Sequence, residues 1–200
     1  MLGRVSVSVL LACLLVGAGH AQPRSSGSYG YDLKGEPVAQ LGSSGDKAVV
    51  LFFIATDCPI SNRYVPEIDR LKKEFAGKPV AFWLVYPNAT ETPEGVLHHQ
   101  AAFSLAGATL VRPSRWFVAQ AQATITPEAA VLIPQGSAWR TVYAGRIDNR
   151  YVDIGRERPQ ATSHDLEDAL DAVLGHRAVV AAGGPPVGCG IVSETALGKR

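Results

Sequence analysis

Cys58 is the residue best placed in this sequence to do chemistry. It follows a continuous apolar stretch, KAVVLFFIA over residues 47–55, and it precedes Pro59. Such a stretch predicts a buried strand, and proline is tolerated in the first turn of a helix because its missing N–H has no partner there. Cys58 should therefore stand where a strand passes into a helix. The free amides and positive dipole end of a helix N-terminus stabilise a thiolate, the nucleophilic form of cysteine.

Ser61 and Asp57 flank this cysteine and act on a thiolate in opposite ways. Ser61 lies three residues further along the predicted helix and can donate a hydrogen bond to the sulfur. The carboxylate of Asp57 disfavours a second negative charge beside it. In the alternative interpretation Cys58 is a small buried apolar residue and does no chemistry.

Thr126-Pro127 stands at the start of another apolar segment, which continues from Glu128 to Ile133. A proline is accommodated at the first residue of a strand because its missing N–H interrupts no hydrogen bond of the ladder there. On its own, this dipeptide indicates no more than the beginning of a strand.

Strands and helices alternate along the chain and must position these residues. The segments predicted as strands are 47–55, 79–86, 109–111, 128–133 and 139–147. The segments predicted as helices run from Pro59 to Gly77, over 91–106, over 114–123, and from Thr162 as N-cap to Gly175. Alternation favours a parallel core, and a hairpin turn at 134–137 adds an antiparallel pair. The sequence therefore predicts an α/β fold, a central mixed β-sheet flanked by helices.

The composition is that of one globular domain. The chain has 200 residues, 46% of them hydrophobic and 18% charged, and its net charge is +1. Since there is no basic excess to neutralise phosphates, we expect no nucleic-acid partner.

The first 21 residues are typical of a signal peptide. Arg4 precedes an apolar run over residues 5–16, which is too short to span a bilayer, and Gly19-His20-Ala21 offers small residues for cleavage after Ala21. We expect an exported, periplasmic or extracellular protein without membrane attachment. Lipidation of Cys13, which follows Leu10-Leu11-Ala12, is the alternative. Cleavage leaves Cys58 and Cys189 in an oxidising compartment, where a disulfide can persist.

The expected organisation of the remaining chain has three parts. Residues 22–30 are rich in serine and glycine and are predicted to be a flexible lead-in. Residues 31–175 hold all the predicted strands and helices and form the domain. Residues 176–200 form a C-terminal tail that carries Cys189.

Several of these segments resemble the thioredoxin fold, and more narrowly the exported redoxins of the alkyl hydroperoxide reductase/thiol-specific antioxidant type within the thioredoxin-like superfamily. The matching segments are TDCPISNRY at 56–64, TPEA at 126–129, GRIDNRY at 145–151 and Gly188-Cys189. The resemblance covers residues 31–175. It implies that Cys58 is the nucleophile, that Pro127 is cis and packs beside it, and that the backbone of Thr126 pairs with an extended thiol substrate.

The sequence also departs from the patterns of that superfamily. Ser61 stands where thioredoxin-type reductases have their second cysteine, and a serine cannot resolve a mixed disulfide. Ala55 and Leu51 replace the Thr or Ser and the Pro of the peroxiredoxin pattern. Asn62 replaces the second cysteine of copper-chaperone relatives. We therefore expect disulfide exchange with protein or small-molecule thiols and disulfides, with no cofactor and no metal.

Two other functions remain open at this point. The first is a thiol peroxidase with antioxidant activity, in which Cys58 attacks a peroxide. The second is a non-catalytic interaction module of thioredoxin fold whose two cysteines form a permanent structural disulfide.

Cys189 is the one remaining candidate for a resolving thiol. Cleavage of the signal peptide leaves Cys58 no other intramolecular partner, and Cys189 lies between Gly188 and Gly190, which permit close backbone approach. The tail could thus fold back over the domain. We predict a disulfide between Cys58 and Cys189.

Two further groups of polar residues are predicted to be structural. His98 and His99 are adjacent on a predicted helix and point about 100° apart, a poor geometry for chelation, so we expect a solvated helix surface. The charged residues of the segment 146–158 are expected to form a solvated, mutually paired loop. A docking surface beside the active site is the alternative for that loop.

Overall fold

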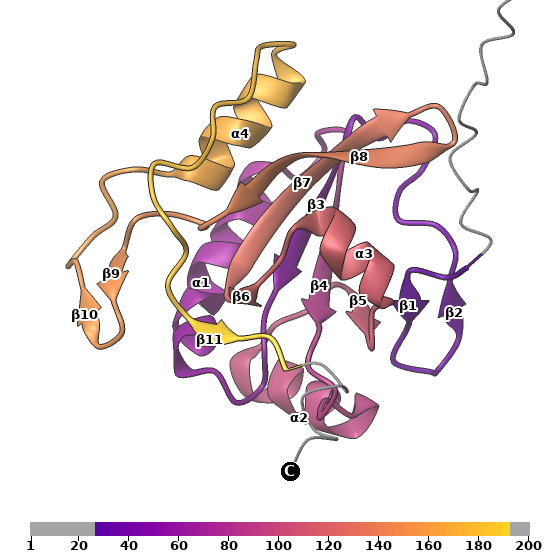
Figure 1. Ribbon diagram of the computed structural model, residues 1–200, viewed down its shortest axis with the longest axis horizontal. Coiled ribbons are helices and arrows are strands. Elements are labelled where there is room, and N and C mark those ends of the chain that lie inside the picture. Colours follow the sequence, from indigo (N-terminus) through magenta and orange to yellow (C-terminus); the bar gives the residue numbers. More distant parts are fainter. Residues whose placement is uncertain (1–26, 193–200) are drawn as a thin grey trace, which may run out of the picture.

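The computed structural model describes residues 27–192 (Figure 1). The predicted signal peptide, its cleavage site after Ala21, Cys13 and the first part of the predicted lead-in lie outside the described residues. Within residues 27–192, no helix combines the length and the apolar character that a bilayer crossing requires.

The centre of the described structure is a seven-stranded sheet in the order β2-β1-β5-β4-β3-β7-β8. Its strands are β1 (Gly30–Tyr31), β2 (Pro37–Val38), β3 (Ala48–Phe53), β4 (Val80–Tyr86), β5 (Ala108–Val111), β7 (Glu128–Gln135) and β8 (Ala138–Gly145). Strands β3, β4 and β5 are parallel, whereas β7 runs antiparallel to β3 and pairs with β8 in a hairpin. The sheet is therefore mixed, as predicted.

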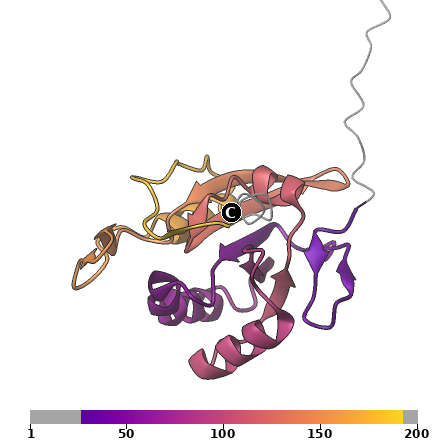
Figure 2. The ribbon, with the colours of Figure 1, turned by 60° about the horizontal axis from the view of Figure 1, so that its bottom comes forward.

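Both faces of the sheet are covered by helices, which are α1 (Pro59–Glu74), α2 (Pro93–Phe103), α3 (Arg115–Ala121) and α4 (Asp165–Leu174). Side chains of α1, α2 and α4 pack with Val50 and Phe52 of β3. Those of α3 pack with Val49 and Leu51, which point to the other face. Figure 2 shows α1 and α2 on one side of the sheet and α3 on the other. Every residue of β3 is consequently buried.

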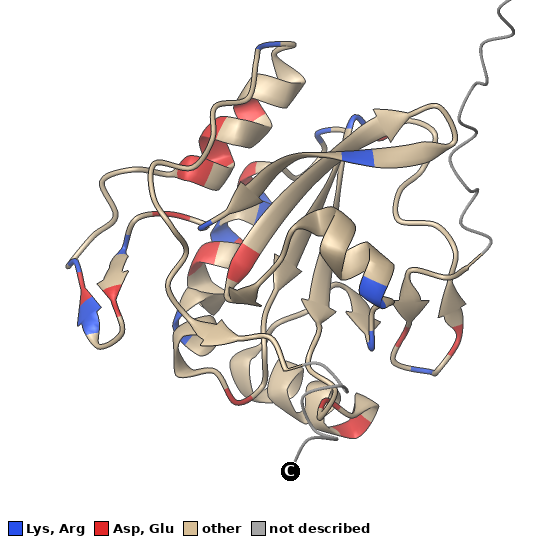
Figure 3. Ribbon diagram, in the orientation of Figure 1, with Lys and Arg blue, Asp and Glu red and all other residues tan. Residues whose placement is uncertain are grey.

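Helix α4 begins later than its sequence predicts. The expected N-cap, Thr162, instead exchanges two hydrogen bonds with Asn149, through its hydroxyl and its backbone N–H. The N-cap residue is His164, and the helix starts at Asp165. Acidic residues occupy its first turn, where they face the positive end of the helix (Figure 3).

The shortest strands were not predicted, because two or three residues are too few to show a periodic pattern. They include β6 (Ile125–Thr126), β9 (Tyr151–Asp153), β10 (Arg156–Glu157) and β11 (Cys189–Gly190). The end of the predicted flexible lead-in also proves to be ordered in the sheet, since β1 begins at Gly30 and the N–H of Tyr29 donates to Val38.

The described part of the tail folds back over the domain and includes β11, yellow in Figure 1. Its first anchor is Gly183, whose N–H donates to Asp165 at 2.7 Å. The carboxylate of Asp165 also forms an ion pair with Arg146. Beyond this anchor, β11 pairs antiparallel with β6, with Cys189 opposite Thr126.

Candidate active site

Cys58 is the N-cap residue of α1. Its backbone is extended, with φ −91° and ψ 108°, and Pro59 occupies the first turn of the helix. The side chain is completely buried. The structure thus places the thiol at the junction of β3 and α1, at the positive end of a 16-residue helix.

The carbonyl of Thr126 and the thiol of Cys189 both lie against the sulfur of Cys58. The carbonyl oxygen of Thr126 lies 3.1 Å away and accepts a hydrogen bond from the thiol, and Sγ of Cys189 lies 2.7 Å away. Both cysteines are free thiols in this structure. Residues 58, 126 and 189, which are widely separated in the sequence, therefore meet at one point.

The pKa of Cys58 is lowered from its ordinary value by a balance of opposing effects. Burial is the largest single effect and favours the neutral thiol. Hydrogen bonds to the sulfur from Cys189 and from both the side chain and the backbone of Ser61 together outweigh it. Ser61 is itself buried.

The pKa of Cys189 changes in the opposite direction and is raised to about 11. Partial burial is the main cause, followed by the hydrogen bond to Cys58, the charge on Cys58 and the carboxylate of Asp57. The charge of Asp57 thus helps to raise the pKa of Cys189. The pair consists of one acidic thiol, which is buried, and one weakly acidic thiol, which is exposed.

The peptide bond between Thr126 and Pro127 is cis, as the resemblance implies. The segment before it is held by Glu128, whose carboxylate accepts hydrogen bonds from the backbone N–H groups of Thr124 and Ile125. This carboxylate orients β6, so that the Thr126 carbonyl faces Cys58 while the outer edge of β6 pairs with the tail.

A buried polar network underlies the loop that leads to Cys58, and part of it corrects the sequence prediction. His99 does not lie on a solvated surface: it is 5% exposed and bonds to the hydroxyl of Tyr86 and the side chain of Asn62. The adjacent His98 is exposed, as expected. The Asn62 amide reaches the carbonyl of Thr56, so the network connects α2 with the loop.

Glu91 holds the same loop from another side and carried no signal in the sequence. Its carboxylate accepts hydrogen bonds from both the backbone N–H and the hydroxyl of Thr56, at 2.9 and 3.0 Å. Burial raises the pKa of Glu91. The loop preceding Cys58 is therefore fixed by side chains from α1 and from the segment that leads into α2.

The charged segment 146–158 is less solvated than predicted. Asp148 is buried and accepts a hydrogen bond from the hydroxyl of Tyr64 in α1. Arg146 bonds to Asp165 of α4, and Glu157 of β10 pairs with Arg63 of α1. These charges pair with the helices, which the sequence could not show, and also with one another, since Arg150 pairs with Glu157.

A pocket of about 310 Å³ lies beside Cys189, between the start of α1 and the hairpin of β9 and β10. Its walls include Pro59, Ile60 and Tyr151, so it is largely apolar. The exposed thiol of Cys189 lines this pocket, whereas Cys58 does not. A molecule that approaches from this side first meets Cys189.

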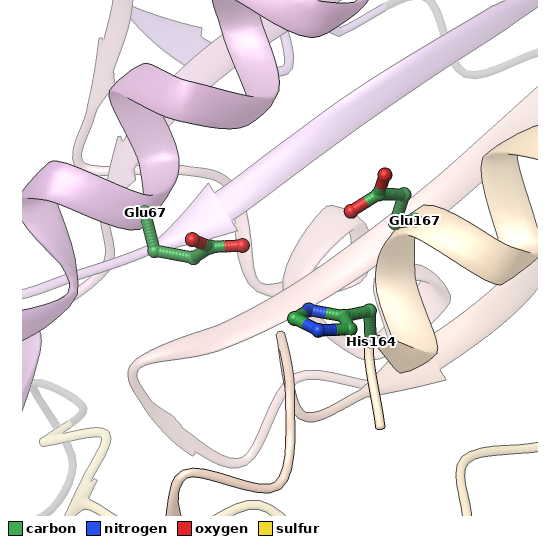
Figure 4. Close-up of side chains that lie close together, drawn as sticks. All are labelled: Glu67, His164 and Glu167. Carbon is green, nitrogen blue, oxygen red and sulfur yellow. The ribbon is translucent and has the colours of Figure 1, made fainter. Parts of the chain in front are cut away.

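A second cluster of ionisable side chains lies away from the cysteines (Figure 4). Glu67 of α1 faces His164 and Glu167 at the start of α4, with ligand atoms within 4.8 Å of one another. The guanidinium of Arg70 bonds to both carboxylates. Because one guanidinium bonds to a carboxylate on each helix, the arrangement is that of an ion-pair bridge between α1 and α4.

Comparison with known proteins identifies solved structures of similar architecture. No protein-family model matches the sequence, and no curated protein does so either. An uncharacterised conserved protein from Geobacillus kaustophilus has a similar structure, with a TM-score of 0.66 and 22% identity over 84% of this chain and 88% of that one. A hypothetical protein from Sinorhizobium meliloti gives a TM-score of 0.66 and 24% identity over 82% and 90%. A proposed thiol–disulfide oxidoreductase from Bacteroides vulgatus gives 0.53 and 17% over 82% and 97%.

The chain has the thioredoxin-like fold. The strand order, the cysteine at the start of α1 and the cis-proline before β7 all agree with this assignment. At these identities the comparisons establish the fold alone, so the chemistry has to be argued from the site.

Proposed function

We propose that this chain is an exported thiol–disulfide oxidoreductase in which Cys58 is the nucleophile and Cys189 the resolving thiol. The observation that carries the proposal is the pairing of a thiol of lowered pKa with a second thiol 2.7 Å away. The N-terminal signal sequence supports export, and N-terminal sequencing of the secreted protein should give Gln22 as the first residue.

The first step uses the thiolate of Cys58. It attacks one sulfur of a substrate disulfide, a new bond joins Cys58 to that sulfur, and the other substrate sulfur leaves as a thiolate that takes a proton from solvent. The helix N-terminus and the hydrogen bonds from Ser61 favour the attacking thiolate. The Thr126 carbonyl, 3.1 Å away, lies against the reacting sulfur.

The second step depends on Cys189. The pKa values of the two thiols determine that Cys58 reacts first and Cys189 second. While Cys58 is ionised, its charge and its hydrogen bond help to raise the pKa of Cys189 to about 11. Both effects disappear when Cys58 becomes part of a mixed disulfide. Cys189 then loses its proton to solvent more readily and attacks Sγ of Cys58, and the second substrate sulfur leaves as a thiolate.

The two steps transfer two electrons from the cysteine pair to the substrate disulfide. The pair ends as a disulfide, and an external dithiol must reduce it before another turnover. In the reverse direction the same steps oxidise a dithiol substrate. Substrates of either kind, protein or small thiols and disulfides, satisfy this chemistry.

The test measures disulfide exchange by the unaltered protein and by Cys58→Ser and Cys189→Ser. We expect Cys58→Ser to lose exchange, and Cys189→Ser to react once and remain as a mixed disulfide. Peroxide consumption is measured in parallel as a control for peroxidase activity. Undiminished exchange by Cys58→Ser would disprove the proposal, and so would rapid peroxide consumption without exchange.

A further inference from the structure

The tail covers the reactive cysteine. Cys58 is completely buried, and the thiol of the tail residue Cys189 on β11 lies against its sulfur. A substrate sulfur must reach Sγ of Cys58 for exchange to occur. Because Cys189 occupies that side of the sulfur, β11 must leave before a substrate can enter.

The tail is held at this position chiefly through its main chain. Cys189 and Gly190 pair with Thr126 and Ile125 of β6, and the N–H of Ile191 donates to the carbonyl of Thr124 at 3.1 Å. The next residue, Val192, exchanges hydrogen bonds with Asn88 and Ala89. Main-chain pairing of this kind accepts any extended polypeptide, so another strand could use the same edge.

The edge of β6 restricts which strands can bind at the residue that precedes the cysteine. A Cβ added at Gly188 would overlap the carbonyl oxygen of Thr126 and would lie 2.7 Å from its carbonyl carbon and 3.1 Å from Cδ of Pro127. Backbone and a proline ring form this wall, so it cannot easily give way. By contrast, a Cβ added at Gly190 meets no described atom within 4 Å.

We infer that β11 occupies the strand site of the substrate, and that the substrate is an extended protein segment whose reactive cysteine follows a glycine. Such a segment pairs antiparallel with β6 and places its sulfur where Cys189 now lies. The residue after the cysteine is unrestricted at its Cβ. This inference rests on the proposed function, and it adds the substrate class and the requirement that the tail be displaced.

Displacement involves a defined part of the tail. The anchor at Gly183, which bonds to Asp165, lies six residues before Cys189, so the strand can leave the edge of β6 while the anchor stays bound. After the first exchange, the substrate strand must vacate the edge while its sulfur remains bonded to Cys58. Cys189 can then return and resolve the mixed disulfide.

The experiment uses full-length Cys189→Ser, in which a mixed disulfide at Cys58 accumulates. Its partners are three octapeptides, each carrying a chromogenic leaving group on its cysteine as an activated disulfide. The first has the tail's own sequence, Pro-Val-Gly-Cys-Gly-Ile-Val-Ser. The second has alanine before the cysteine and the third has alanine after it. Cys58→Ser reports the background from other thiols.

We expect the first and third peptides to react at similar rates and the second at least about tenfold more slowly. A second comparison adds Gly188→Ala or Gly190→Ala to the Cys189→Ser protein. Gly188→Ala weakens docking of the tail, so it should raise the rate with the first peptide at least about threefold. Gly190→Ala, the matched control, should leave that rate unchanged.

Equal rates for the three peptides would overturn the inference, and so would a rate unaffected by Gly188→Ala. A small unhindered disulfide separates this failure from failure of the proposed function. If Cys58 reacts with the small disulfide but does not discriminate among the peptides, only the substrate inference is wrong. If Cys58 fails to react with it even in the Gly188→Ala protein, the proposed function itself is wrong.

Discussion

The sulfur atoms of Cys58 and Cys189 lie 2.7 Å apart, although 131 positions separate the two residues in the sequence. One sulfur is buried at the start of α1 and the other lies exposed on the last described strand. No rearrangement of the backbone is needed to bring them together. The tail therefore brings a second thiol to the sulfur of Cys58.

Mild oxidation should join these two sulfurs in an intramolecular disulfide. The bond would close a loop of about 130 residues, and in the chain-entropy model it would raise the free energy of unfolding by about 5 kcal/mol. Peptide mapping without reductant identifies the linked peptides, and urea unfolding with and without reductant measures the stabilisation. Recovery of both cysteines as free thiols, or only as intermolecular dimers, would contradict this prediction.

The thiolate of Cys58 should persist below the ordinary pKa of cysteine, about 8.5. Because its pKa is lowered, the rate of exchange with a small disulfide should keep its full value to lower pH than that of a model thiol. Ser61→Ala removes one of the hydrogen bonds responsible, so the midpoint of the pH–rate profile should rise. Both profiles are recorded without Gly188→Ala, because loosening the tail would also disturb the hydrogen bond from Cys189 that lowers the same pKa. A midpoint that Ser61→Ala leaves unchanged would show that the hydroxyl does not stabilise the thiolate.

His99 should stabilise the fold, whereas its neighbour His98 should not. Replacing His99 by leucine leaves the buried hydroxyl of Tyr86 and the half-buried amide of Asn62 without this partner, at a cost of about 1–3 kcal/mol. His98→Leu, at the adjacent exposed position, is the matched control and should cost little. Urea unfolding measures the loss of unfolding free energy in each variant. Equal losses in the two variants would contradict the stabilising role of the network around His99.

His99 also predicts a pH dependence of stability. Burial lowers its pKa, so the unfolded chain binds a proton more readily than the folded protein. The contribution of neutral His99 to the free energy of unfolding is fully present above the ordinary pKa of about 6.5. It is lost as the pH falls from there toward the lowered pKa of His99 in the folded state. The free energy of unfolding should therefore fall more steeply over this range in the unaltered protein than in His99→Leu. Parallel pH profiles for the two proteins would contradict the prediction.

Asp165 should control how firmly the tail is held. Its carboxylate accepts hydrogen bonds from Arg146, Ser163 and the backbone of Gly183. Despite partial burial, these bonds lower its pKa to about 2. The free energy of folding that the ionised Asp165 carboxylate contributes is fully present above the ordinary pKa of about 3.9. It is lost as the pH falls toward 2.

Asp165→Asn should accordingly loosen the tail and speed alkylation of Cys58 at neutral pH. Asp171→Asn, at an exposed position on the same helix, is the control and should have no such effect. Alkylation is followed by mass spectrometry of the peptide that contains Cys58. If both variants behave like the unaltered protein, the anchor at Gly183 does not hold β11 in place.

The main strands and helices were predictable because each is long enough to show its own period. The hydrophobic run that forms β3 and the apolar stripe of α1 together place Cys58, and those are local patterns. The groups that adjust the site were not predictable, because they meet only in three dimensions. Glu91, His99 and Asp148 look like ordinary surface residues in the sequence, and only burial against distant partners gives them a role.

The order of the strands along the chain has a consequence for biosynthesis. Cys58 and the edge of β6 both emerge from the ribosome before β11, which is the last described element. At 5–20 residues per second, the 131 residues between the two cysteines take on the order of ten seconds to synthesise. During that interval the thiol of Cys58 is uncovered, and once β6 has been synthesised its edge is unpaired as well, until the C-terminal segment arrives and covers both.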